Sequence, residues 1–291
     1  MRVQPGESVR MAMQAVWSHR IRSSLTILGI VIGITTVVAV ASLLTGLQKG
    51  VVTFFEEFGP DNIFVARFGG DPAQRPKQAE LRRRPLQLNS VEAVKRLAPS
   101  VADVGVQLFI PSILGRQPLV AKVPGYESDR VGMAAYSANF FDIAPRELRA
   151  GRVFTAEEDT RADKVCVLGP SLADALFPDG NALGKSVNVG GAEYAVRGVF
   201  APAKGGFFGE NALDYQMAVP FQTARQRFPQ LDNFFFTIHA KEGQRTQAFE
   251  ESRAILRKVR RVPTDAPDDF SITTPDQIIK SFEQITNAVL L

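Results

Sequence analysis

The feature that most constrains the fold is a charge-free stretch near the N-terminus, residues 26–46, which reads TILGIVIGITTVVAVASLLTG. No charged residue lies between Arg22 and Lys49, and a helix over this interval would be about 39 Å long. The hydrocarbon core of a bilayer is only about 30 Å thick. We therefore expect residues 23–48 to form a membrane-spanning helix.

A long apolar stretch is also compatible with a cleaved signal peptide or with a buried core helix. Ala39-Val40-Ala41 offers the small-residue pattern at which signal peptides are cleaved. The apolar part of a signal peptide covers about 7–15 residues, whereas the apolar residues here begin at Leu25 and continue to Leu47. The same length argues against a core helix. The sequence favours a retained membrane span.

The residues that flank the span predict its orientation. Arg20 and Arg22 precede it, and basic residues near a membrane stay preferentially on the cytoplasmic side. Apolar residues recur at helical spacing within residues 1–22, which predicts a cytoplasmic elbow helix lying in the interface. Trp17, Arg20 and Arg22 are the expected membrane anchor. The remainder of the chain would then lie outside the cytoplasm.

Small residues within the span indicate a helix-packing site. Gly29 and Gly33 form a GxxxG pattern, and Ala41 and Thr45 extend the series of small residues. Small residues let two membrane helices approach closely. The alternative is chance, because small residues are common in membrane helices.

The C-terminal residues 275–291 predict a second helix that heads back toward the membrane. Pro275 stands at a favourable first helical position behind Thr274, and the sequence becomes apolar after Glu283. We expect a stalk and the beginning of a second membrane span, in a chain that is a fragment of a longer protein. The alternative is an amphipathic helix that ends here.

The composition of the remainder is that of a protein that folds in water, with 45% hydrophobic and 22% charged residues overall. Strand-like and helix-like segments alternate through residues 62–123 and again through residues 214–273. Between them lies a strand-rich part, with a hairpin that turns at Gly190-Gly191. The simplest arrangement is one discontinuous α+β domain into which a smaller strand-rich domain is inserted.

The segment DGNALGKS, residues 179–186, is the nearest approach to a nucleotide site. A phosphate-binding loop needs GxxxxGK[ST] with a helix behind it. Here the spacing between Gly180 and Gly184 is one residue short, and Ser186 opens a strand-like segment. We expect an ordinary turn and no bound nucleotide or other cofactor.

No catalytic or metal-binding set of residues is recognisable. The only histidines are His19 and His239, and Ser171 does not stand in a GxSxG pattern. The single Cys166 lies in a buried-strand pattern, and Glu157-Glu158-Asp159 is typical of a helix start. We therefore predict that the chain is not an enzyme.

The basic residues are concentrated in patches, chiefly Arg82-Arg83-Arg84 and residues 257–261, and the net charge is only +4. This distribution does not favour nucleic acid as a partner. A different surface is suggested by the loop AKGGFFGEN, where Phe207 and Phe208 stand among glycines. Exposed aromatic residues on a flexible loop would form a docking site, whereas the alternative is that both rings pack into the inserted domain.

The order of several segments resembles MacB/FtsX-type ABC transporter permeases. The resemblance starts with IRSSLTILGIVIG at residues 21–33 and covers essentially the whole chain. The further segments are FFDIAPRELRAGRVFTAEED (140–159), KVCVLGPSLADALFPDGNALGKSVNVGGAEYAVRGVF (164–200), AVPFQTA (218–224) and DDFSITTPDQI (268–278).

The resemblance implies a periplasmic core made of a porter-like α+β subdomain and an inserted, strand-rich Sabre-like subdomain. The expected parts are an elbow helix (1–22), transmembrane helix 1 (23–48), the stalk and first porter-like half (49–123), the Sabre-like subdomain (124–213), the second porter-like half (214–274), and the stalk with the start of transmembrane helix 2 (275–291). It also implies an inner-membrane subunit that couples ATP hydrolysis to movement of the outer domain. The implied partners are a separate ABC ATPase, a second permease copy, a periplasmic adaptor or cargo protein, and the lipid bilayer.

Two other functions remain open at this point. The chain could be a single-span anchor that carries an extracytoplasmic binding or sensor domain. It could also be an anchored enzyme that uses His239. Family members differ in cargo, which ranges from drugs, peptides and lipoproteins to none, and the sequence does not choose among these.

Overall fold

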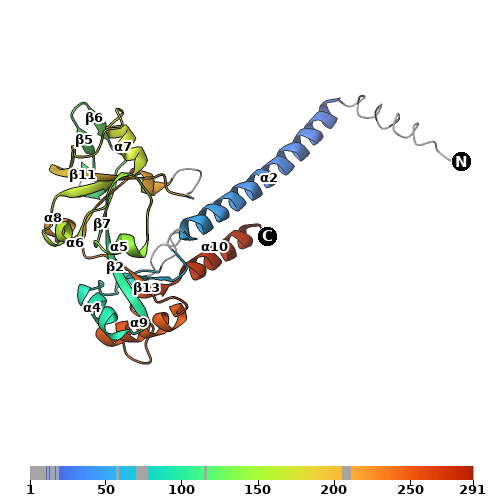
Figure 1. Cartoon of the computed structure of the whole chain (residues 1–291). Helices are drawn as coiled ribbons and strands as arrows, with labels where there is room; N and C mark the ends of the chain where they lie inside the picture. The colour runs from blue at the N-terminus through green and yellow to red at the C-terminus, as the bar shows by residue number, and fades with distance from the viewer. Residues whose placement is uncertain are drawn as a thin grey trace.

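The computed structural model describes residues 11, 13, 17, 20–56, 59–69, 78–114, 117–204 and 211–290. Two long helices project from a body of mixed strands and helices (Figure 1). Helix α2 (Arg20–Glu56) leads away from the body, and α10 (Pro275–Leu290) packs beside its C-terminal part. One helix of the described chain, over residues 20–53, is long and apolar enough to cross a membrane.

Twelve of the described strands join into one sheet. Its order is β14-β1-β13-β2-β7-β12-β9-β11-β10-β5-β6, and β8 also pairs with β11. The β7–β12 and β9–β11 pairs are parallel, and the other pairs are antiparallel. The strands are β1 (Asn62–Ala66), β2 (Val101–Ile110), β5 (Ala121–Val123), β6 (Tyr126–Ser128), β7 (Gly132–Tyr136), β8 (Leu148–Gly151), β9 (Val165–Leu168), β10 (Ser186–Val189), β11 (Ala192–Phe200), β12 (Gln216–Pro220), β13 (Phe234–Ala240) and β14 (Ser271–Thr273). A separate pair is formed by β3 (Ile113–Leu114) and β4 (Gln117–Pro118).

Short helices cover this sheet at both ends. Near the projecting helices, α4 (Leu88–Leu97) and α9 (Arg245–Val259) contact each other and pack against β1, β2 and β13. At the far end, α7 (Pro170–Leu176) packs against β5, β6 and β11 (Figure 1). The remaining helices are α3 (Gln78–Leu81), α5 (Phe140–Ile143), α6 (Ala156–Thr160), α8 (Phe221–Arg227) and the 3₁₀ helix η1 (Ala212–Tyr215).

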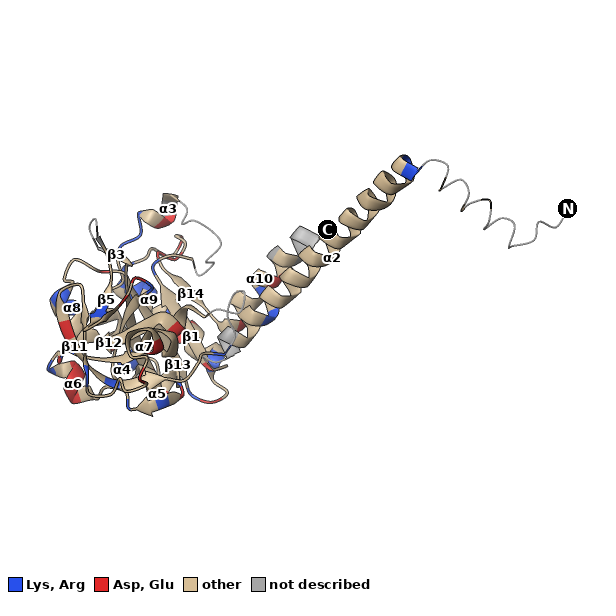
Figure 2. Cartoon of the chain, turned by 90° about the horizontal axis from the view of Figure 1, so that it is seen from above, with Lys and Arg blue, Asp and Glu red and all other residues tan. Residues whose placement is uncertain are grey.

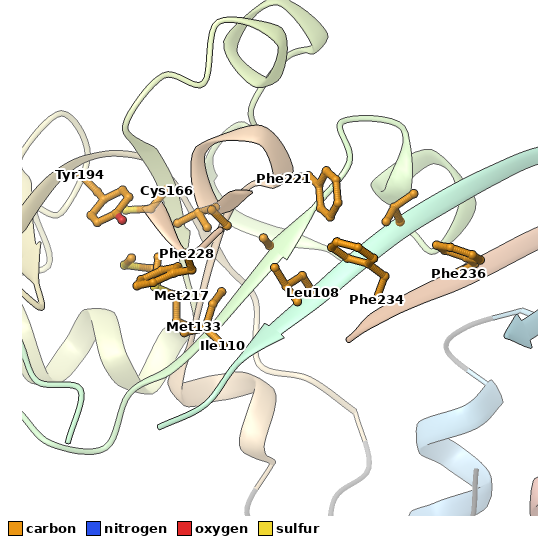
Figure 3. Packing of buried hydrophobic residues seen from close by; sticks show 14 of the residues in the cluster. Leu108, Ile110, Met133, Cys166, Tyr194, Met217, Phe221, Phe228, Phe234 and Phe236 are labelled. Atoms are coloured by element: carbon orange, nitrogen blue, oxygen red, sulfur yellow. The ribbon is translucent and has the colours of Figure 1, made fainter. Parts of the chain in front are cut away.

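The main core is continuous along the sheet. Figure 3 shows buried side chains that follow one another from Phe236 and Leu108, near the projecting helices, to Met217 and Tyr194 toward the far end. A second cluster, built on Phe140, Phe141, Phe154 and Phe200, includes three edge-to-face or tilted contacts made by Phe141 at 5.6–5.8 Å between ring centroids. The main cluster therefore links the two ends of the sheet, and the aromatic cluster adds a large buried apolar surface.

These elements confirm the expected α+β class behind an N-terminal apolar helix. The predicted hairpin turn is present at Gly190 and Gly191, whose φ angles of +56° and +85° suit glycine. Strand β7 was not predicted from the sequence, because its residues 132–136 are almost all buried and no alternation of apolar and polar residues marks them. The sequence QPLVAKV at residues 117–123 predicts a single strand, and this prediction is wrong, because β4 and β5 there join different sheets.

The acidic run Glu157-Glu158-Asp159 opens α6, as expected. Thr155 and Glu158 form a capping box, in which the Thr155 hydroxyl accepts from the Glu158 N–H and the Glu158 carboxylate accepts from the Thr155 N–H. Arg152 also binds this carboxylate through two bonds of 2.7 and 2.9 Å, and Arg197 adds a third at 3.0 Å. The bonds from Arg152 are the largest cause that lowers the pKa of Glu158 from 4.5 to about 2.

This lowered pKa predicts how stability depends on acidity. A carboxylate with a depressed folded-state pKa stabilises the fold fully above its unfolded value, and this stabilisation is lost as the pH falls toward 2. We expect the difference in unfolding free energy between the wild type and Glu158→Gln to grow from about pH 2 to about pH 5 and then stay constant. Denaturant unfolding at several pH values measures it. A difference that does not change with pH would contradict this assignment.

Candidate functional site: the helix pair and its junction with the sheet

The apolar part of α2 presents a large exposed surface. Leu25, Ile30 and Val37 are 67%, 57% and 70% exposed, and none of the most apolar window of this helix is buried. A continuous apolar surface of this extent is not stable in water and is normally covered by lipid or by other helices. This part of the chain is therefore suited to a membrane.

Helix α10 packs on one side of α2, near its C-terminal end. Ala41, Leu44 and Leu47 are half-buried there, and Val51 is only 3% exposed. Successive residues of a helix are rotated by about 100°, which places Gly33 within about 20° of Leu44 and Val51. Gly33 thus lies on the side that α10 covers further along.

The other small residues of the span face elsewhere. On the same helical geometry, Gly29 lies about 60° and Thr45 about 100° from the direction of Leu44. A Cβ added at Gly29 or Gly33 would meet nothing within 4 Å. The Thr45 hydroxyl donates to the Ala41 carbonyl at 2.8 Å, within the helix. The four residues therefore do not form one narrow face.

A polar pair marks the level at which the two helices meet. The Gln48 amide donates to the Glu283 carboxylate at 3.3 Å, and Thr286 of α10 is 3% exposed. From this level toward the N-terminus of α2, and toward the C-terminus of α10, the residues are predominantly apolar. In Figure 2, α2 carries no Lys, Arg, Asp or Glu between its N-terminal turn and this level.

A small polar network fixes the start of β1, the first strand after α2. The Asn62 carboxamide oxygen lies 2.8 Å from Nδ1 of His239, and the Asn62 amide donates to the Ile143 carbonyl at 3.1 Å. These bonds join β1, β13 and α5. His239 thus has a structural partner, as expected for a histidine in a strand, and Ser171 lies in α7 instead of beside it.

The segment at residues 179–186 is a turn. The Asp179 carboxylate accepts from the Lys185 ammonium at 2.8 Å and from the Asn181 N–H at 3.3 Å. Ser186 is the first residue of β10, so no helix N-terminus follows Lys185 as a phosphate-binding loop would need. Cys166 is buried in β9, and burial raises the pKa of its thiol, so the sulfur is not a reactive thiolate.

Two predicted sites fall partly or wholly outside the described residues. Phe207 and Phe208 lie wholly outside the described residues, so the docking loop stays a prediction. For the elbow, the structure describes Trp17, which is 62% exposed, with the Arg20 guanidinium 5.0 Å from the centre of its ring. Arg22 is exposed in the first turn of α2. Within the described ranges, no group of three or more His, Cys, Asp or Glu residues could hold a metal ion.

Comparison with known proteins places these features in one family. Residues 23–253 match the family model described as MacB-like periplasmic core domain. The whole chain aligns with 42% of the length of the macrolide export ATP-binding/permease protein MacB of Chromobacterium violaceum, and the two are 29% identical over this alignment. An uncharacterized ABC transporter permease of Bacillus subtilis, YvrN, is 28% identical over 67% of this chain and 46% of its own length. The chain thus spans less than half the length of these relatives.

A solved structure has the same fold. The periplasmic region of MacB from Actinobacillus actinomycetemcomitans superposes with a TM-score of 0.62 at 16% identity, over 80% of this chain and 97% of that structure.

Proposed function

Because the chain belongs to the family of MacB-like periplasmic core domains, we propose that it is a non-catalytic permease subunit of an ABC-type export or mechanotransmission complex. In this role it couples ATP hydrolysis by a separate ATPase to movement of its outer domain. The observation that carries the proposal is the pairing of α2 with α10 at the base of a MacB-like sheet.

The proposed orientation places Arg20 and Arg22 at the cytoplasmic face of a bacterial inner membrane and the sheet in the periplasm. Basic residues that precede the span support this orientation. The cytoplasmic ATPase would then act on the membrane part, and α2 and α10 would carry the displacement to the sheet. Continuous packing along the sheet supports its movement as one body.

The ATP-binding loop that the proposal requires lies outside these 291 residues. The 291 residues contain no GxxxxGK[ST] sequence, which is the loop that cradles ATP phosphates in such ATPases. The C. violaceum relative is named as an ATP-binding and permease protein in one, whereas the B. subtilis relative is named as a permease. A second permease copy, identical or different, would complete the membrane part.

The porter-like halves (49–123 and 214–274) and the Sabre-like subdomain (124–213) are part of the same proposal. The outer surface would bind an adaptor or a cargo protein, and Phe207 and Phe208 are the proposed docking residues. Strand β7, within residues 124–213, pairs with β2 and β12, so the sheet passes without a break from one proposed subdomain to the other.

The small residues of α2 are proposed to admit a second helix. Replacing Gly29 and Gly33 together with leucine is expected to weaken this contact, because two bulky side chains would keep the helix backbones apart. Cysteine crosslinking between α2 and neighbouring spans in the purified complex measures it, and at least a severalfold loss of crosslinked product is expected. The matched control is Val31→Leu with Ile32→Leu, which keeps the surface bulky. Equal crosslinking in both variants would count against the site.

A second candidate function is a membrane-anchored binding or sensor domain that works without an ATPase. The presence of one described span-like helix agrees with it, whereas the pairing of α10 with α2 favours the permease. The two are separated by purifying the full-length gene product from its native membrane in mild detergent. The permease proposal expects an ABC ATPase subunit in the complex, with ATP hydrolysis in the same fraction. A complex without any ATPase would favour the sensor.

A further inference from the structure

The two projecting helices are joined to the sheet in different ways. Thr274 alone separates β14 from Pro275, the first residue of α10, and β14 pairs with β1 from Ser271 to Thr273. Helix α10 thus continues a strand of the sheet almost directly. Helix α2 is described as far as Glu56, and β1 is preceded by a turn next to Gly59, which has a φ of +81°. Such a turn is a more compliant connection than a paired strand.

The chain just before β14 is tied to the end of α9. The Asp268 carboxylate accepts from Arg253 at 2.7 Å and also from Arg257. The Asp269 carboxylate accepts two bonds from Arg260, at 2.7 and 2.9 Å. The side chains of Asp268 and Arg260 are only 15% and 5% exposed, so these pairs are poorly screened by solvent.

The chain just after β14 is tied to the start of α9. Arg245, the first residue of α9, binds the carboxylate of Asp276 in the first turn of α10. Its guanidinium also donates to the carbonyl of Pro60, in the turn that follows α2. Asp276 is 64% exposed, so this tie is the weaker of the two.

The lengths of the two segments match. Helix α9 has 15 residues and is about 22 Å long. The eight residue steps from Asp268 to Asp276 span about 26 Å when extended. Residues 268–276, here called the strap, therefore run back along α9 and are bonded to it near both ends.

We propose that the strap makes α10 a rigid lever of the outer domain, while α2 bends at the turn around Gly59. The role of such a lever rests on the proposed function, in which the helices transmit movement. A force along α10 would pull β14 parallel to its own axis, past β1. The hydrogen bonds between β14 and β1 and the ion pairs between the strap and the arginines would then resist this sliding all at once, instead of breaking one after another. Movement of α10 is thereby delivered to α9 and to the sheet.

Hydrogen exchange of the full chain in detergent tests this inference, with Asp268→Asn and Asp276→Asn made singly and together. In the wild type, amides in the first turns of α10 are expected to exchange more slowly than those in the last turns of α2. The double variant is expected to speed exchange in α10 and β14 about tenfold and to leave β7 and β12 unchanged. The exposed Asp276→Asn variant alone keeps the test valid if Asp268→Asn fails to fold.

The matched control is Asp174→Asn, which breaks the exposed pair with Arg149 far from the strap and is expected to leave α10 unchanged. Unaltered exchange of α10 in the double variant, or faster exchange in α10 than in α2 of the wild type, would overturn the inference. The measurement uses no ATP and no partner. A negative exchange result would therefore contradict the strap but not the proposed export function. A complex purified without an ATPase would contradict the export function but not the exchange result.

Discussion

Replacing Arg260 with alanine is expected to lower the free energy of unfolding by about 3–5 kcal/mol, because it leaves a partly buried carboxylate without its main partner. Besides Asp269, Arg260 binds the carbonyls of Arg84 at 2.7 Å and Pro85 at 3.1 Å. One guanidinium thus joins three segments: the end of α9, the strap, and the chain before α4. Denaturant unfolding of the full chain in detergent measures the loss.

The matched control for this substitution is Arg225→Ala. Arg225 is exposed on α8, and surface substitutions of this kind usually change stability by less than about 0.5 kcal/mol. If the two variants were equally stable, the arginine network would not hold the strap in place.

Replacing Gly151 with alanine is expected to cost about 3 kcal/mol or more. Gly151 has a φ of +76°, which costs other residues about 1–2 kcal/mol. An added Cβ would also lie 2.2 Å from the Arg197 carbonyl oxygen and 2.8 Å from the Gly198 Cα. Relief of this clash requires β8 and β11 to separate, which adds an overpacking cost of about 1–3 kcal/mol.

Gly191→Ala separates these two contributions. Gly191 has a φ of +85°, but a Cβ there would meet nothing within 4 Å, so only the backbone strain remains. The expected loss is about 1–2 kcal/mol. Thermal unfolding of both variants compares them directly, and equal losses would show that the close approach of β8 to β11 does not matter.

Local patterns in the sequence account for much of the fold. The Gly190-Gly191 turn, the helix start at Glu157-Glu158-Asp159 and the helix behind Thr274 each depend on residues that are close in the chain, and each was predicted correctly. Strand β7 was missed because four of its five residues are buried, on both faces of the sheet. Its residues therefore carry no alternation of apolar and polar side chains that a single sequence reveals.

The junction is the part that the sequence analysis did not reach. Residues 257–261 were interpreted as a basic patch, whereas Arg257 forms an ion pair with Asp268 and Arg260 forms one with Asp269. Two signals for this junction were available in the sequence. Asp268 and Asp269 follow two prolines, and Arg253 and Arg257 are spaced so that they lie on one side of a helix. The contact of Arg245 with Pro60 joins residues 185 apart, and only the folded sheet brings them together.

Within the proposed function, the structure assigns different duties to the parts of the chain. The apolar part of α2 is suited to contact with lipid or neighbouring spans. The pair Gln48 and Glu283 lies at the end of this apolar part, where α2 meets α10. The strap ties α10 to the sheet. Neither His239 nor Cys166 has the surroundings of a reactive group. These features agree with a transmitter of movement that leaves the chemistry of ATP to a partner.

In the proposed function, ATP hydrolysis moves the outer domain. The most direct measurement is the distance between spin labels on Glu127→Cys, in the exposed β6 strand, of the two permease copies in the purified complex. Distances are recorded without nucleotide, with ATP under non-hydrolysing conditions, and with ADP. The proposed coupling predicts that the distance distribution shifts by several ångströms between the ATP-bound and nucleotide-free complexes. Identical distributions in all three states, in a complex that hydrolyses ATP, would contradict it.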